Sequence, residues 1–223
     1  MAAIREASDA LSRAPTLDQA CEQLGLDLSA AQKRRLLAFL DLMARWSATY
    51  NLTSIRDKSE MLTHHLYDCL AIVPALGREL AKQPARQLLD VGSGGGLPGV
   101  VIAVALPDVQ ITCVDAVRKK VAFVRQVGLE LGLPNLSPVH GRIESLQLGP
   151  FNVIASRAYA SLLETVKATQ RLLAPGGRWL SMKGKTPDQE IAALPAGIEA
   201  FHVEHLVVPG VSADRCIIWM RAE

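Results

Sequence analysis

Hydrophobic positions divide the chain into two regions with different periodicities. Up to about residue 80, apolar residues recur at the spacing of a helix face, and no run alternates as a half-buried strand does. From residue 86 onward, short runs rich in β-branched residues alternate with segments of helical spacing, which is the pattern of βαβ units around a parallel sheet. We therefore predict an N-terminal helical region, residues 1–82, and an α/β domain, residues 83–223, with the boundary at Lys82-Gln83-Pro84.

The first region contains two clear helical patterns. One follows Ser29, which forms a capping-box pattern with Gln32, and is predicted to run to about Trp46. The other is predicted to extend from Glu60 to about Leu76 as one amphipathic helix. The segment Tyr50-Asn51-Leu52-Thr53 connects them. This region is therefore expected to be a small helical cap.

The second region is predicted to alternate strands and helices until its C-terminal part. The strands are Gln87–Val91, Gln110–Val114, Leu136–His140, Val153–Ser156 and Arg178–Met182. The helices between them are Leu97–Leu106, Val117–Leu131, Leu162–Leu173 and Asp188–Leu194. Two further apolar runs have no helix between them, Val203–Val208 and Cys216–Met220, so we expect them to form an antiparallel pair.

Composition narrows the class of protein. With 223 residues, 49% of them hydrophobic and 21% charged, the chain can bury a sizeable core in one domain with a modest appendage. The longest apolar run, Val100–Leu106, is too short to cross a bilayer, so we expect no membrane partner and a cytoplasmic location. The four cysteines lack metal-binding spacing, which predicts buried thiols and no metal. A net charge of +2 neither requires nor excludes a nucleic-acid partner.

The strongest chemical signal is a glycine-rich loop between a predicted strand and a predicted helix. It begins at Gly92 and ends at Gly99, with Gly94, Gly95 and Gly96 between them. Glycines allow the backbone to turn sharply and to approach a ligand closely, and the start of the following helix offers free N–H donors. The loop therefore predicts a site for an adenosine-containing cofactor.

Two cofactors are compatible with this loop. The spacing Gly94-x-Gly96-x-x-Gly99 also satisfies the dinucleotide-binding fingerprint. Asp90 argues against a dinucleotide, because a carboxylate that faces the loop repels a pyrophosphate and attracts the cationic methionine end of S-adenosylmethionine. Asp115, at the end of the next strand, is placed to bind the ribose of either cofactor. We favour S-adenosylmethionine and keep a nicotinamide-dependent oxidoreductase as the alternative.

The segments after the later strands indicate the kind of methyl acceptor. The stretch Ile154–Tyr159 lacks the Asn/Asp-Pro-Pro-aromatic loop usual for methylation of exocyclic amines, and it has no cysteine nucleophile for carbon methylation. Basic residues gather near the predicted cofactor site instead: Arg157, Arg142, the pair Lys183 and Lys185, and the run Arg118-Lys119-Lys120. Such a basic mouth suits the phosphates of a nucleic acid.

Five short motifs, taken together, resemble the RsmG (GidB) family of bacterial small-subunit ribosomal RNA methyltransferases. In chain order they are Tyr50-Asn51-Leu52-Thr53, His65-Leu66-Tyr67-Asp68, the loop Asp90–Gly99, Ser156-Arg157-Ala158, and Lys183-Gly184. The resemblance implies a class I, Rossmann-like methyltransferase fold with a small N-terminal helical cap and S-adenosylmethionine as methyl donor. It also implies N(7) of a guanine in the 530 loop of 16S rRNA as acceptor, in free rRNA or in the small ribosomal subunit. No obligate protein partner is evident.

The resemblance assigns roles to individual positions. The cofactor contacts of the family fall on Gly92, Leu97, Ile143, Glu144 and Arg157. The physical argument adds Asp90, Gly94, Gly96 and Asp115. We expect rRNA contacts from Arg118, Lys119, Arg142, Lys183 and Lys185, and we regard Arg157, Lys183 and Tyr159 as candidates for positioning the substrate. His64 and Cys69 depart from the Arg and Ser that are usual in the family.

The expected chemistry needs no general base. Guanine N(7) offers an in-plane lone pair, so catalysis can rest on the alignment of nucleophile, methyl carbon and leaving sulfur. The sequence leaves open whether His64 and His65 pack in the core or touch the substrate, and whether Tyr159 stacks on the target base. A non-catalytic RNA-binding factor of ribosome assembly is a further alternative, because the basic residues would serve it equally well.

Overall fold

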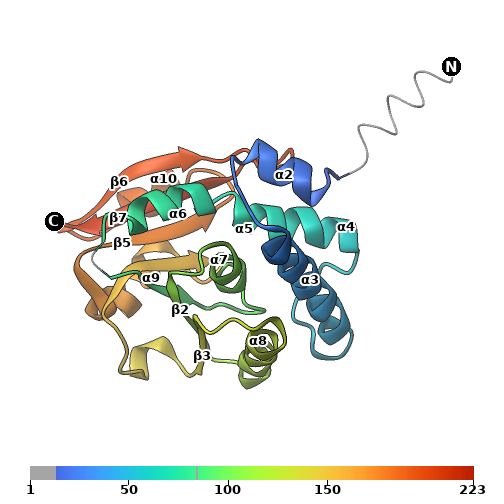
Figure 1. Cartoon of the computed structure of the whole chain (residues 1–223). Coiled ribbons are helices and arrows are strands. Elements are labelled where there is room, and N and C mark those ends of the chain that lie inside the picture. Colours follow the sequence, from blue (N-terminus) through green and yellow to red (C-terminus); the bar gives the residue numbers. More distant parts are fainter. Residues whose placement is uncertain (1–13, 84) are drawn as a thin grey trace, which may run out of the picture.

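A seven-stranded sheet lies at the centre of the molecule, with helices against both of its faces (Figure 1). The structure is a computed structural model that describes residues 14–83 and 85–223. The strands are β1 (Gln87–Val91), β2 (Gln110–Asp115), β3 (Leu136–His140), β4 (Phe151–Arg157), β5 (Leu173–Lys183), β6 (Ile198–His205) and β7 (Cys216–Ala222). They lie in the order β3-β2-β1-β4-β5-β7-β6, and only β7 runs antiparallel to its neighbours.

The connections after β1, β2 and β4 contain α7 (Gly99–Ala105), α8 (Arg118–Leu131) and α9 (Leu162–Thr169). The short helix α10 (Asp188–Ala192) follows β5, and single 3₁₀ turns, η2 (Ile143–Ser145) and η3 (Gln170–Leu172), precede β4 and β5. The predicted α/β architecture and the predicted antiparallel pair at the C-terminus are therefore confirmed.

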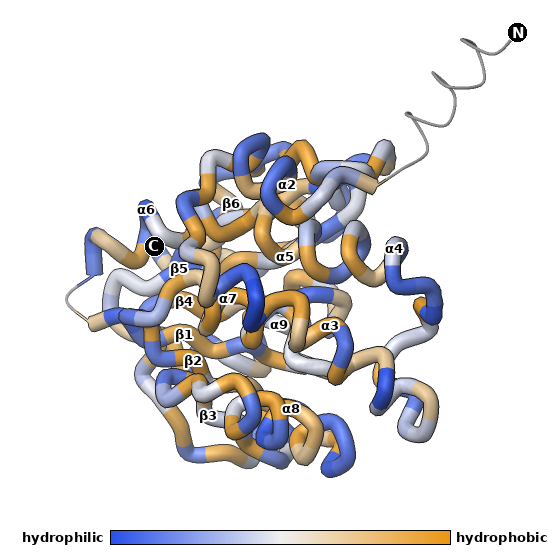
Figure 2. Tube along the Cα trace, turned by 45° about the vertical axis from the view of Figure 1, so that its right-hand side comes forward, coloured by the Kyte–Doolittle hydropathy of each residue, from blue (hydrophilic) through white to orange (hydrophobic). Residues whose placement is uncertain are grey.

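Alternate residues of the central strands enter two separate cores. Leu88, Val153 and Leu180 point to the face covered by α7 and α8, while Leu89, Ile154 and Trp179 point to the face covered by α9. This alternation is the consequence of the two-residue period of a strand. Figure 2 shows hydrophobic segments concentrated in the central strands and in α7, with hydrophilic residues on the outer turns.

The N-terminal helices pack on the first of these faces and share its core. They are α2 (Leu17–Gln23), α3 (Ala30–Tyr50), α4 (Lys58–Met61), the π-helix η1 (Leu62–Tyr67), α5 (Asp68–Leu70) and α6 (Val73–Leu80). Leu36, Phe39 and Met43 of α3 are buried in one cluster with residues of α7 and α8. Gln32 Nε2 also donates to the carbonyl oxygens of Val104 and Ala105, at 2.9 and 3.2 Å, at the end of α7. One hydrophobic core thus contains residues from both sides of the predicted boundary. Of the three boundary residues, Pro84 lies outside the described residues.

The single helix predicted from Glu60 to Leu76 is wrong. The chain forms α4, then one π-helical stretch, then α5, and a new helix begins at Val73. Pro74 has no N–H to continue a helical ladder, so it is tolerated only in the first turn of α6. The helix α2 was not predicted, although Thr16 and Gln19 form a complete capping box before it. Within the described residues, no helix has the length and apolar character that a membrane span requires.

Candidate cofactor and acceptor site

Three adjoining cavities lie at the carboxyl ends of the parallel strands. The loop cavity, about 190 Å³, lies between the glycine loop and the N-terminal helices. The β2 cavity, about 210 Å³, lies between the ends of β1 and β2 and the turn η2. The large cavity, about 480 Å³, lies beside the ends of β4 and β5. Gly92 lines the first two, Tyr159 lines the last two, and His65, Arg157 and Ala158 line both the loop cavity and the large cavity.

The glycine loop is shaped so that backbone, rather than side chains, faces the cavities. Gly92 has a φ of +68°, and a Cβ placed on it would lie 2.4 Å from Cδ2 of Tyr159. The absence of a side chain at Gly92 therefore lets the tyrosine ring lie directly against the loop. Gly94 and Leu97 also line the loop cavity. Gly96 is buried instead, against Val100 and Val124, and serves the packing of the loop on its helix.

Asp115 braces the glycine loop against the end of β2. Its Oδ2 accepts the N–H of Gly94 at 2.9 Å, and its Oδ1 accepts the N–H of Val117 at 2.7 Å. The carboxylate lines the β2 cavity, as the sequence suggested for a ribose contact. Because each carboxylate oxygen can accept more than one hydrogen bond, the ribose hydroxyls of a nucleoside fit within its remaining capacity.

Asp90 does not face the cavities, and this corrects the charge argument made from the sequence. Its side chain has no exposed surface, and its Oδ2 accepts the N–H of Gly99, at the start of α7, at 2.8 Å. A Cβ on Gly99 would lie 2.7 Å from this oxygen, so the glycine is what allows the approach. Oδ1 has no partner within the described residues. Burial raises the pKa of Asp90 to about 7, against the opposing effect of the Gly99 hydrogen bond. Asp90 therefore connects the end of β1 to the start of α7 on the side of the glycine loop that faces away from the cavities.

The turn η2 supplies the other wall of the β2 cavity. Ile143 is buried, Glu144 is exposed, and both line the cavity together with Arg142. The turn is held by Arg171, whose guanidinium donates to the carbonyl oxygens of Leu146, at 3.0 Å, and Ile143. Arg171 was not predicted from the sequence, because it lies in the turn before β5 and belongs to no recognisable motif.

A pair of arginines meets one buried carboxylate at the wall of the large cavity. Asp68 Oδ1 accepts from Arg215 Nε at 2.8 Å, and Asp68 Oδ2 lies 3.3 Å from Arg157 Nη1. The same Arg157 nitrogen donates to the carbonyl oxygen of His64 at 3.2 Å. Asp68 thus connects the N-terminal helices to the end of β4 and to the residue before β7, and it fixes the orientation of Arg157. Arg215 was not predicted, since the only sequence signal was its place directly before an apolar strand.

His65 is buried between the loop cavity and the large cavity and is neutral. Burial lowers its pKa to about 4, and the charge of Arg157 acts in the same direction. Nδ1 lies 3.1 Å from the carbonyl oxygen of His64, which can only accept, so Nδ1 carries the proton. Nε2 then accepts from the Thr53 hydroxyl at 2.7 Å. His65 therefore fastens the connector after α3 to the π-helix.

Lys183 lines the large cavity, but its charge is already paired. Its Nζ lies 2.9 and 3.0 Å from the two carboxylate oxygens of Glu190 and 3.4 Å from the carbonyl oxygen of Ala160. Glu190 also accepts the N–H of Leu162, at 2.7 Å, and so connects α10 with the start of α9. Of the two lysines expected to contact rRNA, Lys183 is thus already paired with Glu190, whereas Lys185 is exposed.

Tyr159 lies at the junction of the β2 cavity and the large cavity. It follows Ala158, which has a φ of +52°, a left-handed conformation that is unusual for a residue with a side chain. Burial raises the pKa of Tyr159, as does the nearby Glu144.

The remaining predicted cations, Arg118 and Lys119, are exposed at the start of α8 and line none of the three cavities. Their neighbour Lys120 lines the loop cavity.

The strand order, the single antiparallel strand, the glycine loop after β1 and the carboxylate at the end of β2 define a Rossmann-like fold with a site for an adenosine-containing cofactor. Together with the family relation given below, they make the chain a class I methyltransferase that uses S-adenosylmethionine. Solved structures of S-adenosylmethionine-dependent methyltransferases share the fold. The glycopeptide N-methyltransferase MtfA, complexed with S-adenosylmethionine, has a TM-score of 0.55 at 13% identity over 69% of this chain and 94% of that chain. A SAM-dependent methyltransferase from Aquifex aeolicus has a TM-score of 0.54 at 16% identity over 72% of this chain and 92% of that chain.

Sequence comparison identifies the family. The family model described as rRNA small subunit methyltransferase G (GidB) matches residues 32–218. The ribosomal RNA small subunit methyltransferase G of Leptothrix cholodnii is 56% identical over 206 residues, 92% of this chain and 94% of its own. The same enzyme of Acidovorax sp. (strain JS42) is 53% identical over 212 residues, which is 92% of this chain and 93% of its own. The chain belongs to this family, and the predicted family, fold class and cofactor are confirmed.

Proposed function

We propose that this protein transfers the methyl group of S-adenosylmethionine to N(7) of a guanine in the 530 loop of 16S rRNA. The observation that carries the proposal is the junction of the loop cavity and the large cavity at Arg157 and Ala158. A donor bound against the glycine loop and an acceptor base in the large cavity would meet there. Membership of the family supports rRNA of the small subunit as the substrate.

The residues around the glycine loop fit S-adenosylmethionine. The adenosine part would be held in the β2 cavity by Asp115, Ile143 and Glu144. The methionine part would lie along the backbone of Gly92 and Gly94 in the loop cavity, where the absence of a Cβ leaves room. When bound, the cofactor supplies an electrophilic sulfonium methyl group.

The large cavity fits a nucleotide as the methyl acceptor. Tyr159 forms one side of it, and the cations Arg157, Lys183 and Arg215 line it together with one carboxylate, that of Asp68. Glu190 orients Lys183, and Asp68 orients Arg157. We therefore propose that Lys183 and Arg157 position the target nucleotide and do not bind distant phosphates. The exposed Arg118, Lys119, Arg142 and Lys185 would contact the phosphates that flank the target.

Two titratable side chains that line the large cavity, those of His65 and Lys183, are already engaged in contacts within the protein. His65 holds its proton on Nδ1 and uses Nε2 for Thr53, and Lys183 is paired with Glu190. This agrees with direct attack by the lone pair of guanine N(7), which needs alignment of the reacting atoms and no base.

The proposal is tested with purified protein, labelled S-adenosylmethionine, and either naked 16S rRNA or unmodified 30S particles. We expect label at one guanine N(7) of the 530 loop, mapped by chemical cleavage at 7-methylguanine. Label at another position, or on neither substrate, would refute the proposal. Tight RNA binding by the wild-type protein without label would favour a non-catalytic assembly factor, and binding of a nicotinamide nucleotide in place of S-adenosylmethionine would favour an oxidoreductase.

A further inference from the structure

An aromatic column leads from the core of the protein to its surface beside the glycine loop. It consists of Phe39, Phe123, Trp46 and Tyr50. Successive ring centroids lie 6.3 Å apart from Phe39 to Phe123, 5.4 Å from Phe123 to Trp46, and 5.2 Å from Trp46 to Tyr50. Phe39 is fully buried, whereas Tyr50, the last residue of α3, is 43% exposed. The outermost ring is therefore held from behind and open to solvent.

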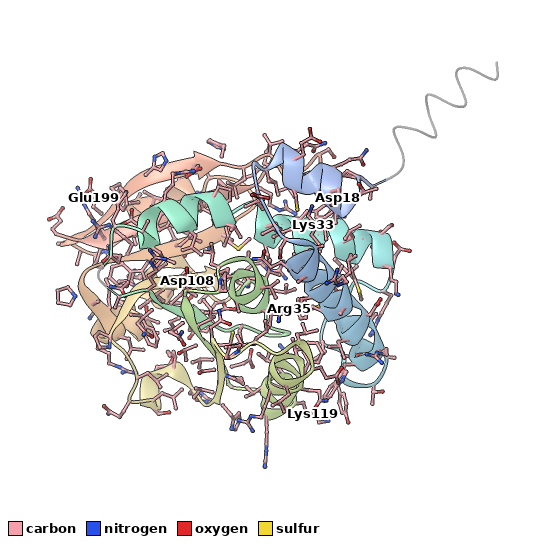
Figure 3. The ribbon with its side chains drawn as sticks, in the orientation of Figure 1. Asp18, Lys33, Arg35, Asp108, Lys119 and Glu199 are labelled. Carbon is pink, nitrogen blue, oxygen red and sulfur yellow. The ribbon has the colours of Figure 1, made fainter. Side chains whose placement is uncertain are left out.

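One cation lies against the exposed ring, and a second is hydrogen-bonded to Asn51, the residue that follows Tyr50. Nζ of Lys119 lies 5.5 Å from the centroid of the Tyr50 ring (Lys119 is labelled on α8 in Figure 3). Arg56 donates to the carbonyl oxygen of Ser47 and, at 2.6 Å, to Oδ1 of Asn51, so uncharged acceptors orient it. Among the residues that the structure describes, neither cation forms an ion pair with a carboxylate.

The column lies at the rim of the proposed cofactor site. Leu52 and Thr53, which follow Tyr50 closely, line the loop cavity, and so does Lys120, the neighbour of Lys119. A Cβ placed on Gly95 would lie 4.0 Å from Cε1 of Phe123, so the column also supports the glycine loop. An RNA strand whose target base entered the large cavity would pass this rim with its neighbouring nucleotides.

A second exposed aromatic ring shows what distinguishes Tyr50. Phe201, on β6, is 37% exposed and lies 5.6 Å from the guanidinium carbon of Arg178 and 5.1 Å from that of Arg221. Both of these arginines are paired with carboxylates, Arg178 with Glu79 at 3.8 Å and Arg221 with Glu199 at 2.6 Å. The Phe201 cluster is thus nearly neutral and lies on the edge strand of the sheet, whereas the Tyr50 cluster is positively charged and adjoins the site.

We propose that Tyr50 stacks on an unpaired base of the rRNA near the target guanine, while Lys119 and Arg56 bind the phosphates on either side of that base. Stacking on aromatic rings combined with basic side chains is how proteins hold single-stranded RNA. A tyrosine ring already fixed by Trp46 loses little conformational freedom on binding. The inference rests on the proposed function, since it names a further contact with the same substrate.

The test compares four variants of the full chain in steady-state methylation of the rRNA substrate identified above. Tyr50→Ala should raise the KM for RNA about 10-fold, with the KM for S-adenosylmethionine and kcat at saturating RNA unchanged. Tyr50→Phe should behave as wild type, because the ring is kept. Phe201→Ala, the matched control, should also behave as wild type. Lys119→Gln should weaken binding and reduce by about one the slope of log Kd against log salt concentration.

The outcomes separate this inference from the proposed function. A wild-type KM for RNA in Tyr50→Ala would overturn the inference while leaving methylation intact. Equal losses of S-adenosylmethionine binding and of RNA binding in Tyr50→Ala would also overturn it, because they would show a purely structural role for the ring. If the wild-type protein methylated no rRNA, the proposed function would fail. Binding of the Tyr50 variants to a 530-loop oligonucleotide would then still decide for or against stacking.

Discussion

The two sides of the cofactor site are built differently. On the sheet side, the glycine loop and the ends of β1, β2 and β4 present backbone to the site, and the loop is held by the carboxylates of Asp90 and Asp115, which accept backbone N–H groups. On the helical side, the connector after α3 and the π-helix η1 are irregular, and single polar side chains hold them, Asp68 toward the arginines and His65 toward Thr53. The sheet side therefore provides a rigid surface for a cofactor, while the helical side depends on a few long-range polar contacts that can be removed one at a time.

The largest effect is expected on the sheet side, at Gly92. Gly92→Ala adds a Cβ that collides with Tyr159 and must adopt a positive φ, so we expect S-adenosylmethionine binding to weaken about 10- to 100-fold. Isothermal titration calorimetry measures this directly. Gly132→Ala is the matched control, because Gly132 has a φ of +59° with nothing within 4 Å of the added carbon. If both variants bound the cofactor equally well, the close packing of Tyr159 on the loop would not matter for binding.

The next effect is expected on the helical side, at Asp68. Asp68→Asn leaves Arg157 and Arg215 without their shared carboxylate, so we expect the free energy of unfolding to fall by about 2 kcal/mol, less than for a fully buried pair because both arginines are partly exposed. We also expect kcat/KM to fall about 10-fold, because Arg157 loses its fixed orientation. Urea unfolding and steady-state kinetics measure the two quantities. Asp108→Asn, which removes an exposed ion pair with Arg86 at 3.7 Å, is the control and should change neither the free energy of unfolding nor kcat/KM. A wild-type kcat/KM in Asp68→Asn would show that Arg157 does not need Asp68 for its orientation.

The difference between the two sides also explains what could be predicted from the sequence. β1 and β3 were predicted with the bounds that the structure has, because their signal is local: apolar runs bounded by turns. The direction of the Asp90 side chain was predicted wrongly, since a loop sequence does not reveal that Gly99 leaves room for a carboxylate behind it. Arg215 and Arg171 were missed for a related reason. Their partners, Asp68 and the turn η2, are remote in sequence, and no spacing rule connects them.

A pH experiment sharpens the comparison, because Asp90 and His65 titrate with opposite consequences. The pKa of Asp90 is raised to about 7 in the folded chain, so the folded state holds its proton more tightly than the unfolded state. Its contribution to stability is complete below about pH 4 and is lost as the pH rises through 7. The pKa of His65 is lowered to about 4, so its contribution is present above about pH 6.5 and is lost as the pH falls through 4.

Asp90→Asn isolates the contribution of the sheet side. We expect the variant to gain stability relative to wild type between pH 5 and 8, by at most about 1.4 kcal/mol per pH unit, because the amide stays neutral while the buried carboxyl must ionise. Urea unfolding at several pH values measures the difference. A constant difference between the two proteins across this range would show that Asp90 keeps an ordinary pKa. Because Asp90 is fully buried and lines none of the three cavities, we expect the affinity of the variant for S-adenosylmethionine at pH 5.5 to be close to that of wild type.

The smallest effect is expected from loosening the helical side at Thr53. Thr53→Val keeps the shape of the side chain but removes the hydroxyl that bonds His65 at 2.7 Å and accepts the N–H of Ile55 at 3.1 Å. We expect the free energy of unfolding to fall by about 1 kcal/mol. Cofactor affinity should fall only slightly, because the glycine loop keeps its own bonds to Asp115. Thr112→Val on β2 is the control, since no hydrogen bond of its hydroxyl lies among the described residues. A loss of cofactor affinity in Thr53→Val as large as in Gly92→Ala would mean that the helical side, and not the loop backbone, dominates cofactor binding.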